Sequence, residues 1–589
     1  MTKLLREASS FTLIVLSLLI VATTSRAQDA TENKNSSNVI SGTVSTRDGG
    51  TLPNARVSVG QVTGGVANRG QVLRLDSSGH FETQPLEPGL YWVSVFAPGY
   101  ITENSQTPPP TPWYRPGDTV SLSLTKAGVI TGAVKNANGD PIVTIPVRAI
   151  MVKNKDGKPL QFSASYRDGM TDDRGIYRLY GLPAGTYVVS AGGPSRYGFY
   201  AGGTTAAYET YVPTYAPSAT RDGAIEIVLN NGDEVTADVQ FREEHGHVIS
   251  GTITGARMSE FGAQTYGVGI SLFDVRNRID VGSGSANPTN NSSFALYGVP
   301  DGEYELYASQ GSNTGDSVMS PAKQIKLQGA DVSGISLALA APGSIEGRIV
   351  LENDPKAACG KHKTEALLEA IVYARRYSPE QSKTAVGNDV PSVYRNSARP
   401  ATLDAKGSFA IKNLQPGSYR VDPREPASGW FLKSITLGPA ARPVSIVRDG
   451  VTLKNGERAS GITVTISEGA SQLVGRITLS EGQSLASNVR VYLVPFEREA
   501  ADNLLRFFEA RPEANGKFTV DYIAPGKYFI IARAAEENEY GTPKPIRFDT
   551  AFRSKVLQEA SASKKEVVFK PCEQTLDYQL PLTVSTSPQ

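Results

Sequence analysis

DSSGHFETQPLEPGLYWVSV, residues 76–95, contains the pattern that decides the fold of this chain. Its centre, FETQPLEPGLY at 81–91, places an aliphatic residue five positions after the first aromatic residue, a glycine at eight and a tyrosine at ten. Four later segments repeat this spacing: YRLYGLPAGTY at 177–187, FALYGVPDGEY at 294–304, FAIKNLQPGSY at 409–419 and FTVDYIAPGKY at 518–528. Such regular recurrence predicts a tandem-repeat protein.

Two further motifs accompany each copy, a glycine-centred apolar motif before it and an alternating motif after it. Alternation of apolar and polar residues is typical of strands with one buried face. The preceding motifs are ISGTV (40–44), ITGAV (130–134), ISGTI (249–253), IEGRI (345–349) and LVGRI (473–477). The following motifs are VSLSL (120–124), ADVQF (237–241), ISLAL (335–339), ITVTI (462–466) and LDYQLPL (576–582). Together they predict an all-β chain of five tandem Ig-like or transthyretin-like β-sandwich domains.

The glycine at position eight of each repeat is expected to form a hairpin turn. In three copies proline comes directly before the glycine, which favours a type II turn. In the other two copies proline lies two positions before the glycine, which favours a type I turn ending in a left-handed glycine. Both solutions require a positive φ at the glycine. The five structural turn glycines are Gly89, Gly185, Gly302, Gly417 and Gly526. Because only backbone geometry is preserved, the motif is interpreted as a hairpin and not as a ligand loop.

These motifs divide the chain into a leader and five repeat units. Residues 1–27 are interpreted as a signal peptide and 28–38 as a disordered leader, and the sandwiches follow at 39–126, 127–244, 245–341, 342–468 and 469–589. Unit 2 carries a Tyr-rich loop and unit 4 a polar insertion. Within that insertion TEALLEAIVYARR (364–376) is a candidate strand or short helix, and residues 497–511 of unit 5 are a candidate helix.

The first residues indicate export. Lys3 and Arg6 precede the apolar run FTLIVLSLLIVA (11–22), and Ser-Arg-Ala at 25–27 is a small-x-small cleavage site. Cleavage after Ala27 is expected, with an uncleaved anchor as the alternative. No later run predicts a transmembrane segment in the mature chain, which is therefore expected in the periplasm, on the outer surface or secreted. The 59 basic and 58 acidic residues give a net charge of +1, which argues against a nucleic-acid partner.

Cys359 and Cys572 are the two cysteines of the chain. In an oxidising compartment such a pair can form a disulfide, which here would connect units 4 and 5. Two separate buried thiols are the alternative. Both possibilities are open from the sequence.

The combined motifs resemble the carboxypeptidase regulatory-like domain. Unit 1 carries the resemblance most fully, in ISGTV (40–44), LPNARVSV (52–59), residues 76–95 and APGY (97–100). The later units keep the first and middle motifs and lose the APGY ending. The resemblance implies a prealbumin-like sandwich similar to starch-binding-type modules and adhesin stalk repeats, in a bacterial, exported, multi-domain protein. It does not define a ligand, because one fold supports many functions.

No motif of the chain predicts catalysis. His362 and Glu365 match the H-x-x-E of zinc carboxypeptidases, but the other histidines (His80, His245, His247) all precede them, so the third ligand is missing. His245-Gly246-His247 is interpreted as an inter-domain turn. Nucleophile elbows, phosphate loops and dinucleotide fingerprints do not occur. We therefore expect a protein that is not an enzyme, without catalytic residues, a metal site or a cofactor.

Two aromatic-rich connections are the candidate ligand-binding segments. The first, at 107–119, contains Trp113 and Tyr114, and the second, at 195–220, contains Tyr208, Tyr211 and Tyr215. Such side chains could stack on sugar rings, anchor a protein partner, or fold back on the sandwich edge. The predicted function is a non-catalytic scaffold, adhesion or binding module that contacts a polysaccharide or another surface protein. The alternatives are a carbohydrate-binding protein using these loops and an accessory subunit of an exported enzyme or transport system.

Overall fold

The structure is a computed structural model that describes residues 38–62, 70–102, 113–193, 208–256, 267–277, 279–286, 292–311, 317–354, 359, 366–377, 401–426, 429–479, 485–513, 515–538 and 543–582. The predicted signal peptide, most of the leader, the first part of the Tyr-rich loop and the His362–Glu365 pair lie outside these residues. The chain divides into two compact units. The first comprises the described parts of residues 1–61, 69–97 and 109–124, and the second comprises the rest.

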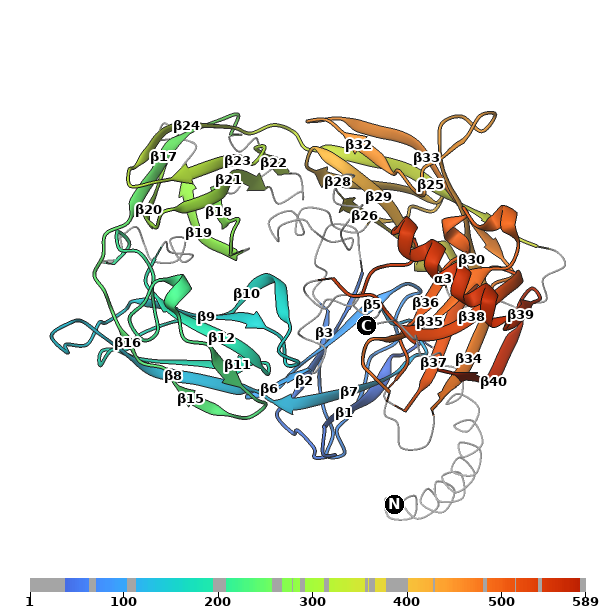
Figure 1. The fold of residues 1–589 in the computed structure, drawn as a ribbon, viewed down its shortest axis with the longest axis horizontal. Coiled ribbons are helices and arrows are strands. Elements are labelled where there is room, and N and C mark those ends of the chain that lie inside the picture. The colour runs from blue at the N-terminus through green and yellow to red at the C-terminus, as the bar shows by residue number, and fades with distance from the viewer. Residues whose placement is uncertain are drawn as a thin grey trace, which may run out of the picture. The chain divides into compact units, whose positions relative to one another are not determined.

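The described strands pair into ten sheets, two within each predicted repeat (Figure 1). We call each pair of sheets a sandwich and number the sandwiches 1 to 5 along the chain. The chain is therefore a tandem β-sandwich protein, as its alternating motifs predict. Division into five independent domains stays a prediction.

Sandwich 1 consists of one sheet around β1 and a second sheet with the order β3-β2-β5. Its first strand pairs antiparallel with β4 and parallel with β7. The strands are β1 (Ser41–Thr46), β2 (Arg56–Gln61), β3 (Gln71–Arg74), β4 (His80–Glu82), β5 (Tyr91–Phe96), β6 (Tyr100–Thr102) and β7 (Thr119–Lys126).

Sandwich 2 pairs a sheet around β8 with a sheet of order β10-β9-β12-β13, to which β14 adds beside β12. Strands β9 and β12 are buried on both faces, so this second sheet has a covered outer surface. The elements are β8 (Gly128–Lys135), β9 (Pro146–Lys153), β10 (Pro159–Met170), β11 (Ile176–Leu182), β12 (Gly185–Ala191), β13 (Thr214–Tyr215), η2 (Arg221–Gly223), β14 (Ile227–Leu229), β15 (Glu234–Thr236) and β16 (Val239–Gln240).

Sandwich 3 pairs the sheet β20-β17-β24 with the sheet β19-β18-β21-β22, in which β23 also pairs β21. Strand β19 forms one edge of the second sheet. The strands are β17 (His247–Thr254), β18 (Val268–Asp274), β19 (Ile279–Ala286), β20 (Ser293–Val299), β21 (Gly302–Gly311), β22 (Ser317–Met319), β23 (Lys323–Leu327) and β24 (Val332–Ala338).

Sandwich 4 pairs the sheet β28-β25-β33-β30-β31 with the sheet β27-β26-β29-β32. The candidate segment at 364–376 forms both expected structures, a short 3-10 helix followed by a strand. The elements are β25 (Gly343–Glu352), η3 (Ala366–Glu369), β26 (Ile371–Tyr377), β27 (Ala401–Thr402), β28 (Ser408–Leu414), β29 (Gly417–Arg424), β30 (Trp430–Leu437), β31 (Val444–Ser445), β32 (Val451–Leu453) and β33 (Arg458–Glu468).

Sandwich 5 pairs the sheet β37-β34-β40 with the sheet β36-β35-β38-β39. The candidate helix at 497–511 is a wrong prediction, because the segment forms two 3-10 turns and a strand whose apolar side chains are buried. The elements are β34 (Ser471–Thr478), β35 (Val489–Pro495), η5 (Arg498–Ala500), η6 (Leu504–Arg506), β36 (Phe508–Ala510), β37 (Lys517–Ile523), β38 (Gly526–Ala534), α3 (Thr550–Ser563), β39 (Glu566–Phe569) and β40 (Gln574–Pro581).

Helix α3 covers the outer face of the sheet that contains β35 and β38 (Figure 1). The Asp549 side chain caps it by accepting a hydrogen bond from the Phe552 amide, at 2.8 Å. Phe552 and Val556 pack with Tyr492 in a second apolar cluster outside the sandwich core. Strand β35 is therefore buried on both faces.

The tyrosine at position ten of every repeat closes the turn that precedes it. Its hydroxyl donates to the carbonyl four residues earlier, so the hydrogen bond fixes the connection between two strands, as in the tyrosine corner of other sandwiches. The pairs are Tyr91 to Glu87, Tyr187 to Pro183, Tyr304 to Pro300, Tyr419 to Gln415 and Tyr528 to Ala524, at 2.7–2.9 Å. All five tyrosines are buried.

The glycine of the motif that opens each repeat permits close approach of a neighbouring strand. The first strand of every sandwich pairs in parallel with a strand near the end of its repeat. A Cβ on the motif glycine would lie under 3.0 Å from a carbonyl oxygen of the segment alongside. These glycines are Gly42, Gly132, Gly251, Gly347 and Gly475. A side chain there would separate the two segments.

The two strands that flank each turn lie in different sheets and do not pair with each other, so the expected hairpin is a wrong prediction. Each strand pairs instead with a non-local partner in its own sheet, and the turn is a corner between the two sheets of a sandwich.

The backbone of the turn glycine also differs between repeats, and the predicted positive φ is confirmed in three of the five. Gly89, Gly417 and Gly526 have φ values of 147°, 149° and 143°, positive but larger than the value near +80° of an ideal type II turn. Gly185 and Gly302 lie outside the positive-φ range, so that prediction is wrong for them. A Cβ on Gly185 would lie 2.8 Å from the Lys153 carbonyl oxygen, so close packing explains this glycine.

The left-handed residue lies four positions earlier, at position four of repeats 2 to 5. Gly181, Gly298, Asn413 and Tyr522 have φ values of 76°, 66°, 63° and 58°. Each coincides with a break in the pairing register between the first strand and its neighbour. The position is therefore a β-bulge, which bends the strand before the turn.

Candidate functional site

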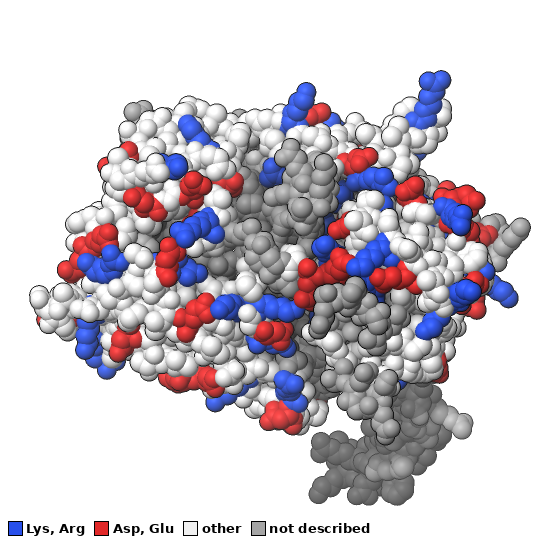
Figure 2. Space-filling view, in the orientation of Figure 1, with Lys and Arg blue, Asp and Glu red and all other residues white. Residues whose placement is uncertain are grey.

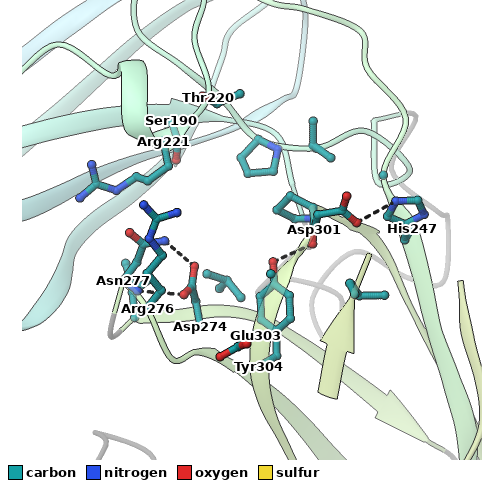
Figure 3. Close-up of a pocket in the computed structure, with 18 of the residues that line it drawn as sticks. Ser190, Thr220, Arg221, His247, Asp274, Arg276, Asn277, Asp301, Glu303 and Tyr304 are labelled. Atoms are coloured by element: carbon teal, nitrogen blue, oxygen red, sulfur yellow. Dashed lines mark hydrogen bonds and ion pairs between the residues drawn. The ribbon is translucent and has the colours of Figure 1, made fainter. Parts of the chain in front are cut away.

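A cavity of about 930 Å³ lies between sandwiches 2 and 3, within the second compact unit (Figure 3). We call it the 2–3 cleft. Sandwich 2 contributes the outer faces of β9 and β12 and the segment from Val212 to Asp222. Sandwich 3 contributes the β18–β19 hairpin, the start of β21 and the end of β23. Cavities of this size between domains are typical places for ligands.

The apolar part of the cleft comes from strand residues that face away from the sandwich cores. Ile150 and Val188 project from sandwich 2 and pack with Ile279 of β19 and with Tyr215. Ile150 is 4% exposed and Ile279 6% exposed, so the contact excludes water. It explains why β9 and β12 are buried on both faces.

Arg148 fastens the two sandwiches to each other. Its side chain is 7% exposed and donates from Nη1 to the carbonyl oxygen of Val281, at 2.9 Å. Val281 lies on the edge strand β19. A charged donor to a backbone acceptor gives a strong hydrogen bond when both are shielded from water.

The end of the Tyr-rich loop, from Val212 onward, lines the cleft. Tyr211 stacks on His245, with ring centroids 4.4 Å apart. The Val212 amide donates to the Glu244 carbonyl at 2.9 Å, and the Gly246 amide donates to the Thr210 carbonyl at 2.9 Å. The connection between the sandwiches is therefore a short paired segment and not a loose linker.

The charged groups around the cleft are largely paired with one another. Arg276 Nη1 lies 3.3 Å from Asp222, and His247 Nε2 lies 3.2 Å from Asp301. His247 Nδ1 also lies 3.7 Å from Asp331. Figure 3 shows Arg221, Arg276 and Asn277 on one side of the cleft and His247 and Asp301 on the other.

The β18–β19 hairpin presents Asp274 to the cleft in a fixed orientation. The Asn277 amide donates to Asp274 Oδ1 at 2.9 Å, and Asn277 Nδ2 donates to Asp274 Oδ2 at 2.7 Å. Burial, together with the negative charge of Asp274, raises the pKa of Tyr304. Burial also raises the pKa of Tyr215, while the nearby Arg221 opposes this effect. Both phenols are therefore neutral at physiological pH.

The aromatic residues proposed from the sequence are partly or fully buried. Tyr208 and Tyr211 are half-buried and contact Phe241, with centroids 5.9 and 5.8 Å apart. Tyr215 is 8% exposed and belongs to β13. In sandwich 1, Tyr114 forms a β-bridge with Tyr91, and Trp113 beside it is half-buried. Of these residues, Tyr215 lines the 2–3 cleft.

Cys359 and Cys572 form a disulfide between sandwiches 4 and 5, with their Cα atoms 5.0 Å apart. Cys359 lies in the insertion of sandwich 4, and Cys572 lies in the turn between β39 and β40. Formation of the bond in the exported protein stays a prediction.

Among the described residues, no group of three or more His, Cys, Asp and Glu side chains could hold a metal ion. In the same part of the chain, no helix combines the length and the apolar character needed to cross a bilayer. The described surface in Figure 2 shows basic and acidic side chains interspersed.

The sequence did not reveal the 2–3 cleft. Its lining residues come from two repeats and from positions between 148 and 328, without a common spacing. The one available signal is the polar turn DVRN at 274–277, where Asp and Asn mark a hairpin.

Comparison with known proteins supports the resemblance seen in unit 1. Residues 39–112 match the model of the carboxypeptidase regulatory-like domain. No curated protein matches the chain.

Solved structures that resemble the chain include three proteins of Gram-positive bacteria. The Bacillus anthracis TIE protein is 17% identical, with 51% of this chain and 50% of that chain covered and a TM-score of 0.14. This chain thus spans half the length of that protein. Two B repeat units of the Staphylococcus aureus collagen binding protein are 12% identical (73% and 99% covered, TM-score 0.12). The Streptococcus agalactiae minor pilin GBS52 is 17% identical (38% and 96% covered, TM-score 0.19).

Proposed function

We propose that this chain is an exported, non-catalytic protein whose β-sandwiches act as a surface or periplasmic scaffold, adhesion or binding module. One observation carries the proposal: the residues that recur in the repeats serve the fold. The tyrosines close turns, the opening glycines admit a neighbouring segment, and the bulge residues bend strands. Repetition has therefore preserved a structural unit, and binding belongs to features that differ between repeats.

The 2–3 cleft is the feature best suited to binding. It combines an apolar floor with polar groups in fixed orientation, which is the usual composition of a ligand site. Its carboxylates are engaged with arginine, histidine or amide donors, as for Asp222, Asp301 and Asp274. Groups held in this way suit recognition better than proton transfer.

Export can be tested by expressing the full chain in a bacterial host and fractionating the cells. We expect the mature protein outside the cytoplasm, with residue 28 as its first residue. The measurement is intact mass of the recovered chain, combined with its distribution between fractions. A full-length chain confined to the cytoplasm would overturn the proposal.

The binding role can be tested with the mature protein immobilised as bait for extracytoplasmic material of the native organism. We expect retention of a polysaccharide or of another surface protein. Retention of an exported enzyme or transporter component would instead favour the accessory-subunit alternative. Conversion of any retained material into a new product, detected by mass spectrometry, would contradict the non-catalytic role.

A further inference from the structure

We propose that the 2–3 cleft binds a short neutral oligosaccharide. This inference rests on the proposed binding role and names the ligand class of that site. It places sugar recognition between two sandwiches, away from the aromatic loops.

The cleft favours a neutral ligand because its charges are close to balance and several of them are paired with one another. Six acidic and four basic side chains line it, so an anionic ligand would meet an excess of negative charge. Arg276 pairs with Asp222 at 3.3 Å, and Lys326 Nζ lies 3.8 Å from Glu303. A ligand in the cleft would therefore interact with these side chains mainly through hydrogen bonds and less through net charge.

The lining of the cleft offers both hydrogen-bond donors and hydrogen-bond acceptors to a ligand. A guanidinium carries five N–H donors, and each carboxylate oxygen accepts two hydrogen bonds. Asp274 accepts one bond from Asn277 at each oxygen and keeps a second acceptor position on both. Thr220 adds a hydroxyl that both donates and accepts. Sugar hydroxyls, which are donors and acceptors at once, match such a lining.

The floor of the cleft matches the remaining surface of a sugar. Val281, which is half-buried, offers apolar surface below the polar rim, beside the buried pair Ile150 and Ile279. A pyranose ring has carbon-bound hydrogens on its faces and hydroxyls on its edges. It can therefore lie against Val281 while its edges reach the rim. A volume of about 930 Å³ accommodates several rings.

An extended peptide is disfavoured because the suitable backbone edge is occupied. Peptides commonly bind by adding a strand to an exposed sheet edge. Strand β19 is the sheet edge in the cleft, but the Val281 carbonyl already accepts from Arg148 at 2.9 Å. A peptide strand would have to displace that buried arginine.

The test is isothermal titration calorimetry of the mature full chain with maltohexaose, cellohexaose and chitohexaose. Hexagalacturonate and hexa-alanine serve as anionic and peptide probes. We expect at least one neutral hexasaccharide to bind, and neither of the other two probes to bind as tightly. Absence of neutral saccharide binding, or tighter binding of the anionic or peptide probe, would overturn the inference.

Two variants test whether saccharide binding takes place in the 2–3 cleft. Arg221→Ala with Arg276→Ala removes donors at the rim, and Thr220→Trp adds bulk at an exposed rim position. We expect each to weaken saccharide binding about tenfold or more. Arg178→Ala, which removes an exposed arginine paired with Glu234 on sandwich 2, is the matched control and should leave binding unchanged.

Unchanged affinity in both cleft variants, with circular dichroism confirming that they fold, would overturn the assignment. The two proposals fail separately. An exported chain that binds no saccharide leaves the scaffold role intact, whereas a chain retained in the cytoplasm overturns that role whatever it binds in vitro.

Discussion

The junction between sandwiches 2 and 3 and the junction between sandwiches 4 and 5 are held by different means. At the first, Arg148 and a small apolar cluster join the two sandwiches, and a cavity of about 930 Å³ stays open beside them. At the second, the Cys359–Cys572 disulfide crosses the junction, and the Cys572 amide donates to the Gly469 carbonyl at 3.1 Å. A smaller cavity, of about 440 Å³, is lined by sandwich 5 and by Glu425 of sandwich 4. Contacts between domains are usually polar and permit motion unless something fastens them. The second junction is therefore held covalently, whereas the first is held by non-covalent contacts beside a larger cavity.

The largest effect is expected from removing the covalent fastening. Replacing both Cys359 and Cys572 by serine should lower the free energy of unfolding of the joined sandwiches by about 2–5 kcal/mol, because a long loop of the unfolded chain is no longer closed. Calorimetry should show the transition of sandwiches 4 and 5 at lower temperature, and that of sandwiches 2 and 3 unchanged.

The disulfide between Cys359 and Cys572 can be detected by mass spectrometry. Reduction of the native protein should raise its intact mass by about two daltons. Two thiols that react freely with an alkylating reagent in the native protein would contradict the bond and remove the contrast between the junctions.

A smaller effect is expected when the 2–3 junction is disturbed at Gly298. This bulge residue has a φ of 66°, and a Cβ on it would contact the carbonyl oxygens of Glu209 and Tyr211 from sandwich 2. Gly298→Val should cost about 2–4 kcal/mol of stability through backbone strain and overpacking, measured by chemical denaturation.

Gly334→Val provides the matched control. Gly334 also has a positive φ, 70°, but a Cβ on it has nothing within 4 Å. It should therefore show the backbone strain alone, about 1–2 kcal/mol. Equal losses in the two variants would mean that Gly298 has no role in the junction.

Loss of the tyrosine-corner hydrogen bond should lower the stability of sandwich 2 and of sandwich 5 by a similar amount. Tyr187→Phe in sandwich 2 and Tyr528→Phe in sandwich 5 each remove one buried hydrogen bond to a turn carbonyl. We expect each to cost about 1 kcal/mol in denaturant unfolding. A loss confined to one sandwich would show that the corner is a local feature and not a property of the repeat.

The smallest expected effect is on the loss of stability at acidic pH. The Arg174 side chain lowers the pKa of Asp172 in sandwich 2, and the Ser408 amide lowers the pKa of Asp404 in sandwich 4. Because the folded-state pKa is below the unfolded value, the stabilisation is present above about pH 4 and lost as the pH falls through the folded pKa. Asp172→Asn with Asp404→Asn should weaken this acid dependence, measured as thermal stability between pH 2 and pH 6. An unchanged profile would contradict it.

The repeat pattern predicted much of the fold because strands and turns leave local signals. Alternation marks the strands, and the spacing from Phe409 to Tyr419 marks a corner that recurs in other repeats. The left-handed position was missed because Gly181 and Gly298 share it with Asn413 and Tyr522, so residue type alone does not identify it. Pairing with the opening strand, which is non-local, imposes the bulge.

Two other features depend on tertiary contacts that a single sequence does not display. Helix α3 has few large apolar residues and turns Arg553 toward the protein, so its pattern is weak. The 2–3 cleft requires side chains from separate repeats to meet, as Arg148 and Val281 do. The sequence motifs therefore favoured the aromatic loops, where Tyr208 and Tyr211 pack against the core of sandwich 2.

The parallel pairing of opening and closing strands has a mechanical consequence. In sandwich 1, Ser41 pairs with Thr119 and Thr46 with Leu124, so the chain enters at one end of the ladder and leaves at the other. A pulling force on the two ends would slide the strands past each other instead of peeling them apart. All hydrogen bonds of the ladder would then carry the load together, which is the geometry that best resists tension.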